Sequence, residues 1–287
     1  MEKTTSGWIN GFIGVAIFAG SLPATRVAVT DFSPTFLTCV RASIAAVLGL
    51  ALLLLLRQPR PKMADTPSLA LSALGVVVGF PLLTALALQY VTSAHSIVFL
   101  GLLPLCTAVF AVIRGGERPR PPFWLFSVIG AAFVVGYALM GDGEASLQGD
   151  LLMLGAVVVC GLGYAEGASL SRRLGGWQVI SWSLVLSLPI MLPIALLTLP
   201  ASFGHVGIPA WVGLAYVSLF SMLLGFVFWY RGLAQGGIAA VGQLQLLQPF
   251  MGLGLAALLL HEKVSWTMLV VTVAAVICVA GAKKYAK

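Results

Sequence analysis

A chain of 287 residues with 60% hydrophobic and only 9% charged side chains departs from soluble domains, in which about a quarter of the residues are charged. One crossing of a bilayer takes about 20 apolar residues, and ten apolar segments of that order follow one another here with short polar connections. The composition therefore predicts an all-α polytopic membrane protein and excludes a sizeable soluble domain.

The expected helices follow from these apolar runs in chain order. The first five cover Trp8–Val29, Pro34–Leu56, Pro67–Gln89, Ser93–Ile113 and Pro122–Met140, and the second five cover Gln148–Leu170, Gln178–Leu199, Pro209–Leu233, Ile238–Leu260 and Ser265–Gly281. The first run could also be a cleaved signal peptide. Against this, both Glu2 and Lys3 precede the run, and its removal would leave the first half one helix short.

An internal repeat organises the chain. Residues 94–136 align without a gap with residues 239–281, and Pro104 falls on Pro249. Eight of the 43 positions are identical, so placement carries more weight than identity. In both copies the proline lies inside an apolar run.

The same alignment places Glu117 on Glu262, and each glutamate follows the apolar run that contains its proline. We expect two homologous halves, residues 1–141 and 148–287. Because each half holds five helices, the second would enter the membrane from the opposite side. The fold class predicted is thus ten transmembrane helices in two inverted five-helix repeats, an architecture typical of alternating-access transporters.

The distribution of Lys and Arg predicts the orientation, because cytoplasmic loops accumulate these residues. With both termini inside, thirteen of the sixteen face the cytoplasm, Arg26 and Lys263 face outward, and Arg41 lies within the second helix. The net charge of +7 then has a membrane explanation, and no nucleic-acid partner is needed. The expected location is the bacterial inner membrane.

Several motifs carry a family resemblance: Phe18-Ala19-Gly20-Ser21 before Pro23, Ser33-Pro34 before Arg41, and the two Pro…Glu helix ends. Over its whole length the chain resembles EamA-type members of the drug/metabolite transporter superfamily, in particular bacterial amino-acid exporters. Phe18 departs from the tryptophan that is frequent there. The resemblance implies a central cavity lined by the first, third, fourth, sixth, eighth and ninth helices.

Pro104 and Pro249 lie about halfway along the fourth and ninth expected helices. A proline there removes a backbone hydrogen bond and frees the carbonyl four residues earlier, which belongs to Leu100 or Gln245. Facing a cavity, such a carbonyl could accept a hydrogen bond from a substrate ammonium. The alternative is that the prolines only kink the helices for packing.

Three amides, Gln243, Gln245 and Gln248, lie in the ninth expected helix. Burying an unpaired amide costs about 1–3 kcal/mol, so we expect this face to line a polar cavity, with hydrogen bonding between helices as the alternative. The equivalents of Gln245 and Gln248 in the first half are Leu100 and Leu103. This difference predicts one polar and one apolar wall.

Aromatic residues supply further candidates for substrate binding: Tyr90, Phe99, Tyr164, Trp182 and Trp229. Tyr and Trp near helix ends often form interfacial belts. Deeper in the expected helices lie Tyr164, Trp182 and Trp229. These three residues either line a substrate path or only pack against neighbouring helices.

Ionisable residues inside a membrane suggest function. Glu166 is a candidate for proton coupling, or for an ion pair with Arg172 or Arg173 at the cytoplasmic end of its helix. Arg41 could snorkel outward or pair with Asp31. His95, at the outer start of the fourth helix, is either a substrate contact that titrates near neutral pH or simply solvated.

No catalytic or phosphate-binding motif occurs, and His261-Glu262 lacks the second histidine of a zinc site. We therefore expect no enzymatic activity, cofactor or metal. The predicted function is export of small amphiphilic solutes, foremost aromatic and other neutral amino acids, by alternating access. Export of lipophilic drugs or other metabolites is the alternative, and a passive pore is the alternative of another class. The expected partners are the substrate and the bilayer, with no oligomer required.

Overall fold

The computed structural model describes residues 2–115, 120–140, 146–236 and 241–285, and within these ranges the secondary structure is entirely helical. In the first half the elements are α1 (Glu2–Ala19), α2 (Ser21–Ala28), α3 (Pro34–Leu55), η1 (Met63–Asp65), α4 (Thr66–Ser72), η2 (Ala73–Gly79), α5 (Phe80–Ala87), α6 (Ser93–Phe99), η3 (Leu100–Leu102), α7 (Leu103–Gly115) and α8 (Pro121–Met140). The second half contains α9 (Leu147–Leu174), α10 (Gly176–Leu197), α11 (Ile208–Ala215), η4 (Tyr216–Leu224), α12 (Gly225–Gly236), η5 (Gly242–Leu247), α14 (Gln248–Leu260) and α15 (Trp266–Lys284).

Seven helical spans in the described ranges are long and apolar enough to cross a membrane. They correspond to the first four and the sixth to eighth expected helices. Three shorter apolar helices, 121–137, 244–260 and 266–278, lie where the fifth, ninth and tenth were expected. The multi-pass helical class is confirmed, whereas ten crossings stay a prediction.

Local sequence explains where several helices begin and end. Ser33 caps α3 by accepting a hydrogen bond from the Phe36 amide at 3.2 Å, and Pro34 occupies the first turn, where its missing N–H costs nothing. The first expected helix is interrupted at Gly20, so that α1 and α2 are separate. There the Tyr216 hydroxyl donates to the Ile17 carbonyl at 2.7 Å. A Cβ on Gly20 would lie only 2.5 Å from that hydroxyl oxygen.

The helices pack in pairs that relate the two halves. α3 packs on α10 and α8 packs on α15, while α1 packs on α12 and α9 packs on α5 and η2. Small residues let these backbones approach closely. A Cβ on Gly232 would lie 2.6 Å from the Gly11 nitrogen, and one on Gly75 would lie 2.6 Å from the Gly163 Cα.

Irregular helical turns recur at equivalent positions of the two halves. The π-helical segment η2 has its counterpart within the π-helical segment η4, and the 3-10 segment η3 has its counterpart within η5, both at the 145-residue spacing of the sequence repeat. Pro104 and Pro249 each occupy the second position of the α-helix that follows the 3-10 turn. The repeat thus extends to details of backbone geometry.

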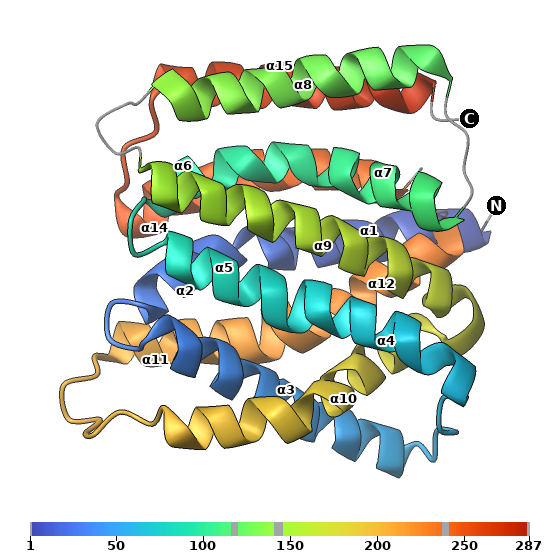
Figure 1. Cartoon of the computed structure of the whole chain (residues 1–287), viewed down its shortest axis with the longest axis vertical. Coiled ribbons are helices and arrows are strands. Elements are labelled where there is room, and N and C mark those ends of the chain that lie inside the picture. The colour runs from blue at the N-terminus through green and yellow to red at the C-terminus, as the bar shows by residue number, and fades with distance from the viewer. Residues whose placement is uncertain (1, 116–119, 141–145, 237–240, 286–287) are drawn as a thin grey trace.

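Figure 1 shows helices running back and forth along one direction, with both chain ends at the same end of the bundle. We call this the terminal end. Hydrogen bonds tie its segments together, including Arg120 N to Tyr285 O at 3.0 Å and Gln178 Nε2 to Gln58 Oε1 at 3.1 Å. At the opposite end, Asp31 accepts from the Gly207 amide at 2.8 Å.

Candidate functional site

A small cavity lies at the centre of the bundle and receives side chains from both halves. Its polar lining consists of Ser21, Arg41, Tyr164, Ser221 and Gln248. Its apolar lining consists of Phe18, Leu22, Val76, Phe80, Pro81, Leu103, Cys160 and Phe226. We call this the central cavity. Its volume is about 20 Å³, room for a water molecule, so a larger solute would require the helices to move apart.

Arg41 is the charged residue of the central cavity. Its side chain is buried, with 5% of the residue exposed, and one terminal nitrogen donates to Ser221 Oγ at 3.2 Å. Ser221 Oγ is in turn 2.7 Å from Ser21 Oγ. Asp31, the partner considered in the sequence, accepts from Gly207 instead. Arg41 therefore points inward and neither snorkels nor pairs with Asp31.

Aromatic rings line the central cavity together with Arg41, Ser21 and Ser221. Phe18 and Phe226 have ring centroids 4.9 Å apart, and Tyr164 lies 5.9 Å from both Phe226 and Trp229. Together with Tyr230, which contacts Phe226 at 5.3 Å, these rings form what we call the aromatic cluster. Trp229 and Tyr230 follow Ser221 along one helical segment, and both side chains are almost fully buried.

The structure brings part of the predicted set to this site. Tyr164 and Gln248 line the central cavity. Gln245 is buried, its side-chain nitrogen has no hydrogen-bond partner, and Trp229 belongs to the aromatic cluster. Gln243 lies in η5, but its side chain is outside the described part of the chain.

Other predicted residues lie elsewhere in this conformation. Phe99 and Leu100 are buried but do not line the cavity. Tyr90 is 46% exposed and accepts from Gln148 Nε2 at 3.1 Å. Trp182 of α10 packs against the hydrophobic core.

The carbonyls that the prolines free have local partners. The Leu103 amide donates to the Leu100 carbonyl, and the Gln248 amide donates to the Gln245 carbonyl. Both bonds are i to i+3 bonds of the 3-10 turns, which satisfy carbonyls that a proline leaves unpaired. Each freed carbonyl therefore already accepts one hydrogen bond, and its role toward a substrate stays a prediction, whereas the change of helical geometry at both prolines agrees with the sequence.

His95 is fully buried rather than solvated. Its Nε2 is 2.6 Å from Asp150 Oδ1, and its Nδ1 is 2.9 Å from the Tyr137 hydroxyl. These contacts join α6, α9 and α8 away from the central cavity. Both ring nitrogens are engaged within the protein, and the sequence did not reveal this because Asp150 lies 55 positions from His95.

Glu166 pairs with a different arginine from those expected. Its Oε1 is 2.5 Å from Arg114 Nε, which links α9 to α7, while Arg173 pairs with Asp65 at 2.6 Å. The partner of Glu166 is therefore a residue of another helix, and not Arg172 or Arg173 of its own helix. The proton-coupling role stays a prediction.

Glu262 has a capping role that the sequence analysis missed. Its carboxylate accepts from the Ser93 hydroxyl at 2.7 Å and from the Ser93 and Ala94 amides at 3.1 and 2.7 Å. A carboxylate satisfies the unpaired N–H groups of a helix start. Glu262 therefore fastens the end of α14 to the start of α6. Its repeat partner Glu117 lies outside the described residues.

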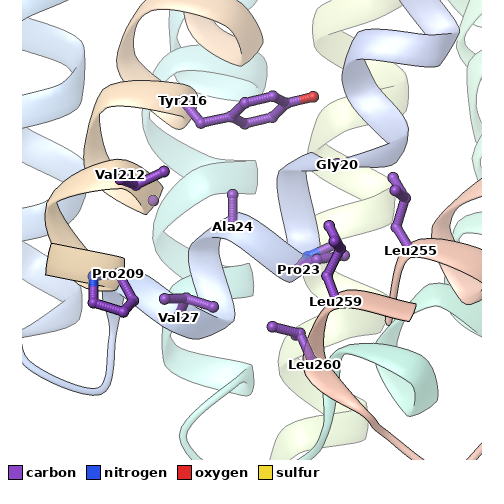
Figure 2. A pocket seen from close by; sticks show the side chains of 11 residues that line it. Gly20, Pro23, Ala24, Val27, Pro209, Val212, Tyr216, Leu255, Leu259 and Leu260 are labelled. Atoms are coloured by element: carbon purple, nitrogen blue, oxygen red, sulfur yellow. The ribbon is translucent and has the colours of Figure 1, made fainter. Parts of the chain in front are cut away.

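A second, larger hollow opens between α2, α11 with η4, and the end of α14, away from the terminal end. Figure 2 shows Pro23, Ala24 and Val27 of α2 facing Val212 and Pro209, with Leu255, Leu259 and Leu260 along another side. Its volume is about 330 Å³. Tyr216 crosses it toward Gly20, and the lining is otherwise apolar. We call it the outer groove.

The fold is thus a multi-pass helical bundle in which both halves of the chain line one buried central cavity. The EamA-like transporter family model matches residues 5–139 and again residues 147–282. The chain therefore belongs to the EamA-like transporter family and carries two copies of its repeat.

Relatives agree with this assignment. The chain is 67% identical over 287 residues, the full length of both proteins, to "Uncharacterized transporter YdeK" of Bacillus subtilis. It is 23% identical over 239 residues to a "Probable terminal-alkyne amino-acid exporter" of Streptantibioticus cattleyicolor, covering 82% of this chain and 79% of that protein. A crystal structure with 20% sequence identity matches with a TM-score of 0.67 over 97% of this chain and 95% of the other, which shows a shared fold.

Proposed function

We propose that this protein exports small amphiphilic solutes, foremost neutral amino acids with aromatic or other large apolar side chains, by alternating access. The observation that carries the proposal is the central cavity, in which one guanidinium, one amide and several hydroxyls face aromatic rings. Ligand sites typically combine apolar walls with a few orienting polar groups. This combination suits a zwitterion with an apolar side chain better than a purely lipophilic molecule.

The export of an amino acid also has support from a relative. The Streptantibioticus cattleyicolor protein is named as an amino-acid exporter, and it aligns with most of this chain. In this chain the described cavity lining contains one cation and no acid. A single cation favours a solute with one anionic group over multiply charged phosphates or dicarboxylates, which need several cationic contacts.

The inverted arrangement of the halves is part of the proposal. In Figure 1, α1 runs away from the terminal end and its counterpart α9 runs toward it. The recurring π and 3-10 turns and the pairing of α3 with α10 and α8 with α15 support the same relation. Halves of this kind can exchange conformations, which opens a central site to one side and then to the other.

We place the terminal end in the cytoplasm of a bacterium and the protein in the inner membrane. At the terminal end of the bundle lie Arg57, Arg114 and Arg173. Asp31 and Glu262 lie at the opposite end of the bundle. An excess of Arg and Lys on one side marks the cytoplasmic face.

Counterflow in liposomes tests the proposal. Purified protein is reconstituted in vesicles loaded with unlabelled phenylalanine, leucine, serine or glutamate, and uptake of labelled phenylalanine is followed with and without a pH gradient. Loaded phenylalanine and leucine should accelerate uptake, and glutamate should not. Protein-free vesicles give the background.

Each alternative predicts another result. Non-saturating flux without counterflow would indicate a passive pore. Exchange of a lipophilic drug with no exchange of any amino acid would overturn the proposed substrate class in favour of drug export.

A further inference from the structure

Arg41 carries a buried charge that no carboxylate of the described part of the chain neutralises. Its polar contact is with Ser221, and its Nε has no hydrogen-bond partner. Five acids have described side chains, and each engages another group: Asp31 with Gly207, Asp65 with Arg173, Asp150 with His95, Glu166 with Arg114 and Glu262 with Ser93. The guanidinium therefore faces the central cavity with donors to spare.

An unpaired charge in this position is costly. Arginine does not lose its proton in proteins, and removing an ion from water costs several kcal/mol unless a counter-charge and hydrogen bonds compensate. A charged residue inside a membrane span generally marks the path of a substrate or ion. The missing counter-charge in this cavity is thus expected to arrive with a ligand.

The geometry of the donor selects the kind of anion. A guanidinium presents parallel N–H groups that match the two oxygens of a carboxylate. The other orphaned group of the cavity is the Gln248 carboxamide oxygen, which is buried and has no partner. It can accept a hydrogen bond from an ammonium group but cannot replace a carboxylate as a counter-charge.

We propose that Arg41 binds the carboxylate of the transported solute in the central cavity, with Gln248 accepting from its ammonium group and the aromatic cluster contacting its side chain. This proposal rests on the proposed function and deepens it. It makes a free carboxylate a requirement for recognition. Because the cavity holds about 20 Å³ in this conformation, binding accompanies a separation of the helices around Arg41.

Three ligands of one shape test the assignment: phenylalanine, phenylalaninamide and 3-phenylpropionate. Binding to the purified protein in detergent is measured by calorimetry, and transport by counterflow. The wild-type protein should bind phenylalanine at least about tenfold more tightly than the amide, since a hydrogen bond to a charged group is lost. Arg41→Gln should weaken the binding of phenylalanine by a similar factor. It should also abolish the preference for phenylalanine over phenylalaninamide.

The preference of Arg41→Lys for phenylalanine over the amide should lie between the preferences of the wild type and of Arg41→Gln, because lysine keeps the charge but loses the paired donors. The matched control is Arg172→Gln, which removes an exposed arginine outside the cavity. This variant should leave the ratio of the affinities for phenylalanine and its amide unchanged. A melting curve for each variant shows whether it is folded.

A second variant keeps the test decisive if Arg41→Gln does not fold. Ser221→Asp puts a carboxylate beside Arg41 and supplies the missing counter-charge. This variant should be at least as stable as the wild type, and it should bind phenylalanine at least about tenfold more weakly because the substrate carboxylate now competes with an internal one. An unchanged ratio of phenylalanine to amide in folded Arg41→Gln or Ser221→Asp would overturn the proposal.

The ligand series separates this inference from the proposed function. Binding of 3-phenylpropionate but not of phenylalanine would keep the carboxylate site and refute amino-acid export. Binding of phenylalanine and its amide with equal affinity by the wild-type protein would keep amino-acid recognition and refute the role of Arg41. Binding of none of the three would refute both.

Discussion

The hydroxyl oxygens of Ser21 and Ser221 lie 2.7 Å apart at the centre of the bundle, although 200 positions separate these residues in the chain. Ser21 begins α2, directly after the interruption at Gly20, and Ser221 lies in the π-helical segment η4. Two helical irregularities thus meet beside Arg41. Local departures from α-helical geometry often accompany functional sites, and here they bring two hydroxyls and a guanidinium to one cavity.

The two serines should differ in their contribution to stability. Ser221→Ala removes the hydrogen-bond acceptor of Arg41 as well as the contact with Ser21, so we expect the free energy of unfolding to fall by about 1–3 kcal/mol. Ser21→Ala leaves the bond between Arg41 and Ser221 in place and should cost about 1 kcal/mol or less. Reversible unfolding in mixed micelles measures both. Equal losses would mean that the bond from Arg41 contributes nothing.

The ion pair between Glu166 and Arg114 should support the fold. Glu166→Gln leaves Arg114 without its partner, and we expect a loss of roughly 1–2 kcal/mol, between the values for exposed and buried pairs, since Arg114 is half exposed. Arg172→Gln, on the exposed face of the same helix end, is the control and should change stability by less than about 0.5 kcal/mol.

The same Glu166→Gln protein tests proton coupling. If Glu166 serves only its ion pair, the dependence of counterflow on a pH gradient should match that of the wild type. A variant that is fully stable but no longer responds to the gradient would instead assign the coupling role to Glu166.

The hydrogen-bonded group of His95, Asp150 and Tyr137 should act on stability rather than on substrate affinity. Asp150→Asn weakens a buried contact to a charged group and should cost about 1–3 kcal/mol, while the apparent substrate affinity in counterflow should stay constant. Arg172→Gln, at an exposed arginine, is the control and should alter neither quantity. A change of substrate affinity without loss of stability in Asp150→Asn would return His95 to the substrate path.

The contact between α1 and α12 should tolerate no additional methyl group at Gly232. A Cβ there would lie 2.6 Å from the Gly11 nitrogen and 2.8 Å from its Cα, so Gly232→Ala should destabilise the protein by about 1–3 kcal/mol through overpacking. Gly254→Ala is the matched control, because no atom lies within 4 Å of its added Cβ. Higher helix propensity should make that variant neutral or more stable by up to about 1 kcal/mol. Thermal melting of the two variants side by side distinguishes these effects.

Much of the architecture could be read from the sequence because it depends on local chemistry. Apolar length predicts where helices lie, Ser33-Pro34 predicts the start of α3, and the spacing of Pro104 and Pro249 predicts a repeat whose irregular turns recur in the structure. Tyr164 and Gln248 reach the central cavity because deep polar and aromatic groups in a membrane span need partners or a polar space. The sequence placed the charge of Arg41 inside a membrane span, where charged residues suggest function, but it did not reveal that Ser221 is the hydrogen-bond partner of Arg41.

The tertiary structure alone decided which groups meet. His95 contacts Asp150 and Tyr137, Glu166 pairs with Arg114, and Arg41 donates to Ser221. The partners in each case lie too far apart in the chain for a local sequence pattern to predict the contact. The 3-10 turns that occupy the carbonyls of Leu100 and Gln245 also depend on how each helix packs on its neighbours. The physical reason is that apolar content and caps specify that a segment is helical, whereas its rotation about its axis and its contacts depend on the packing of all the other helices.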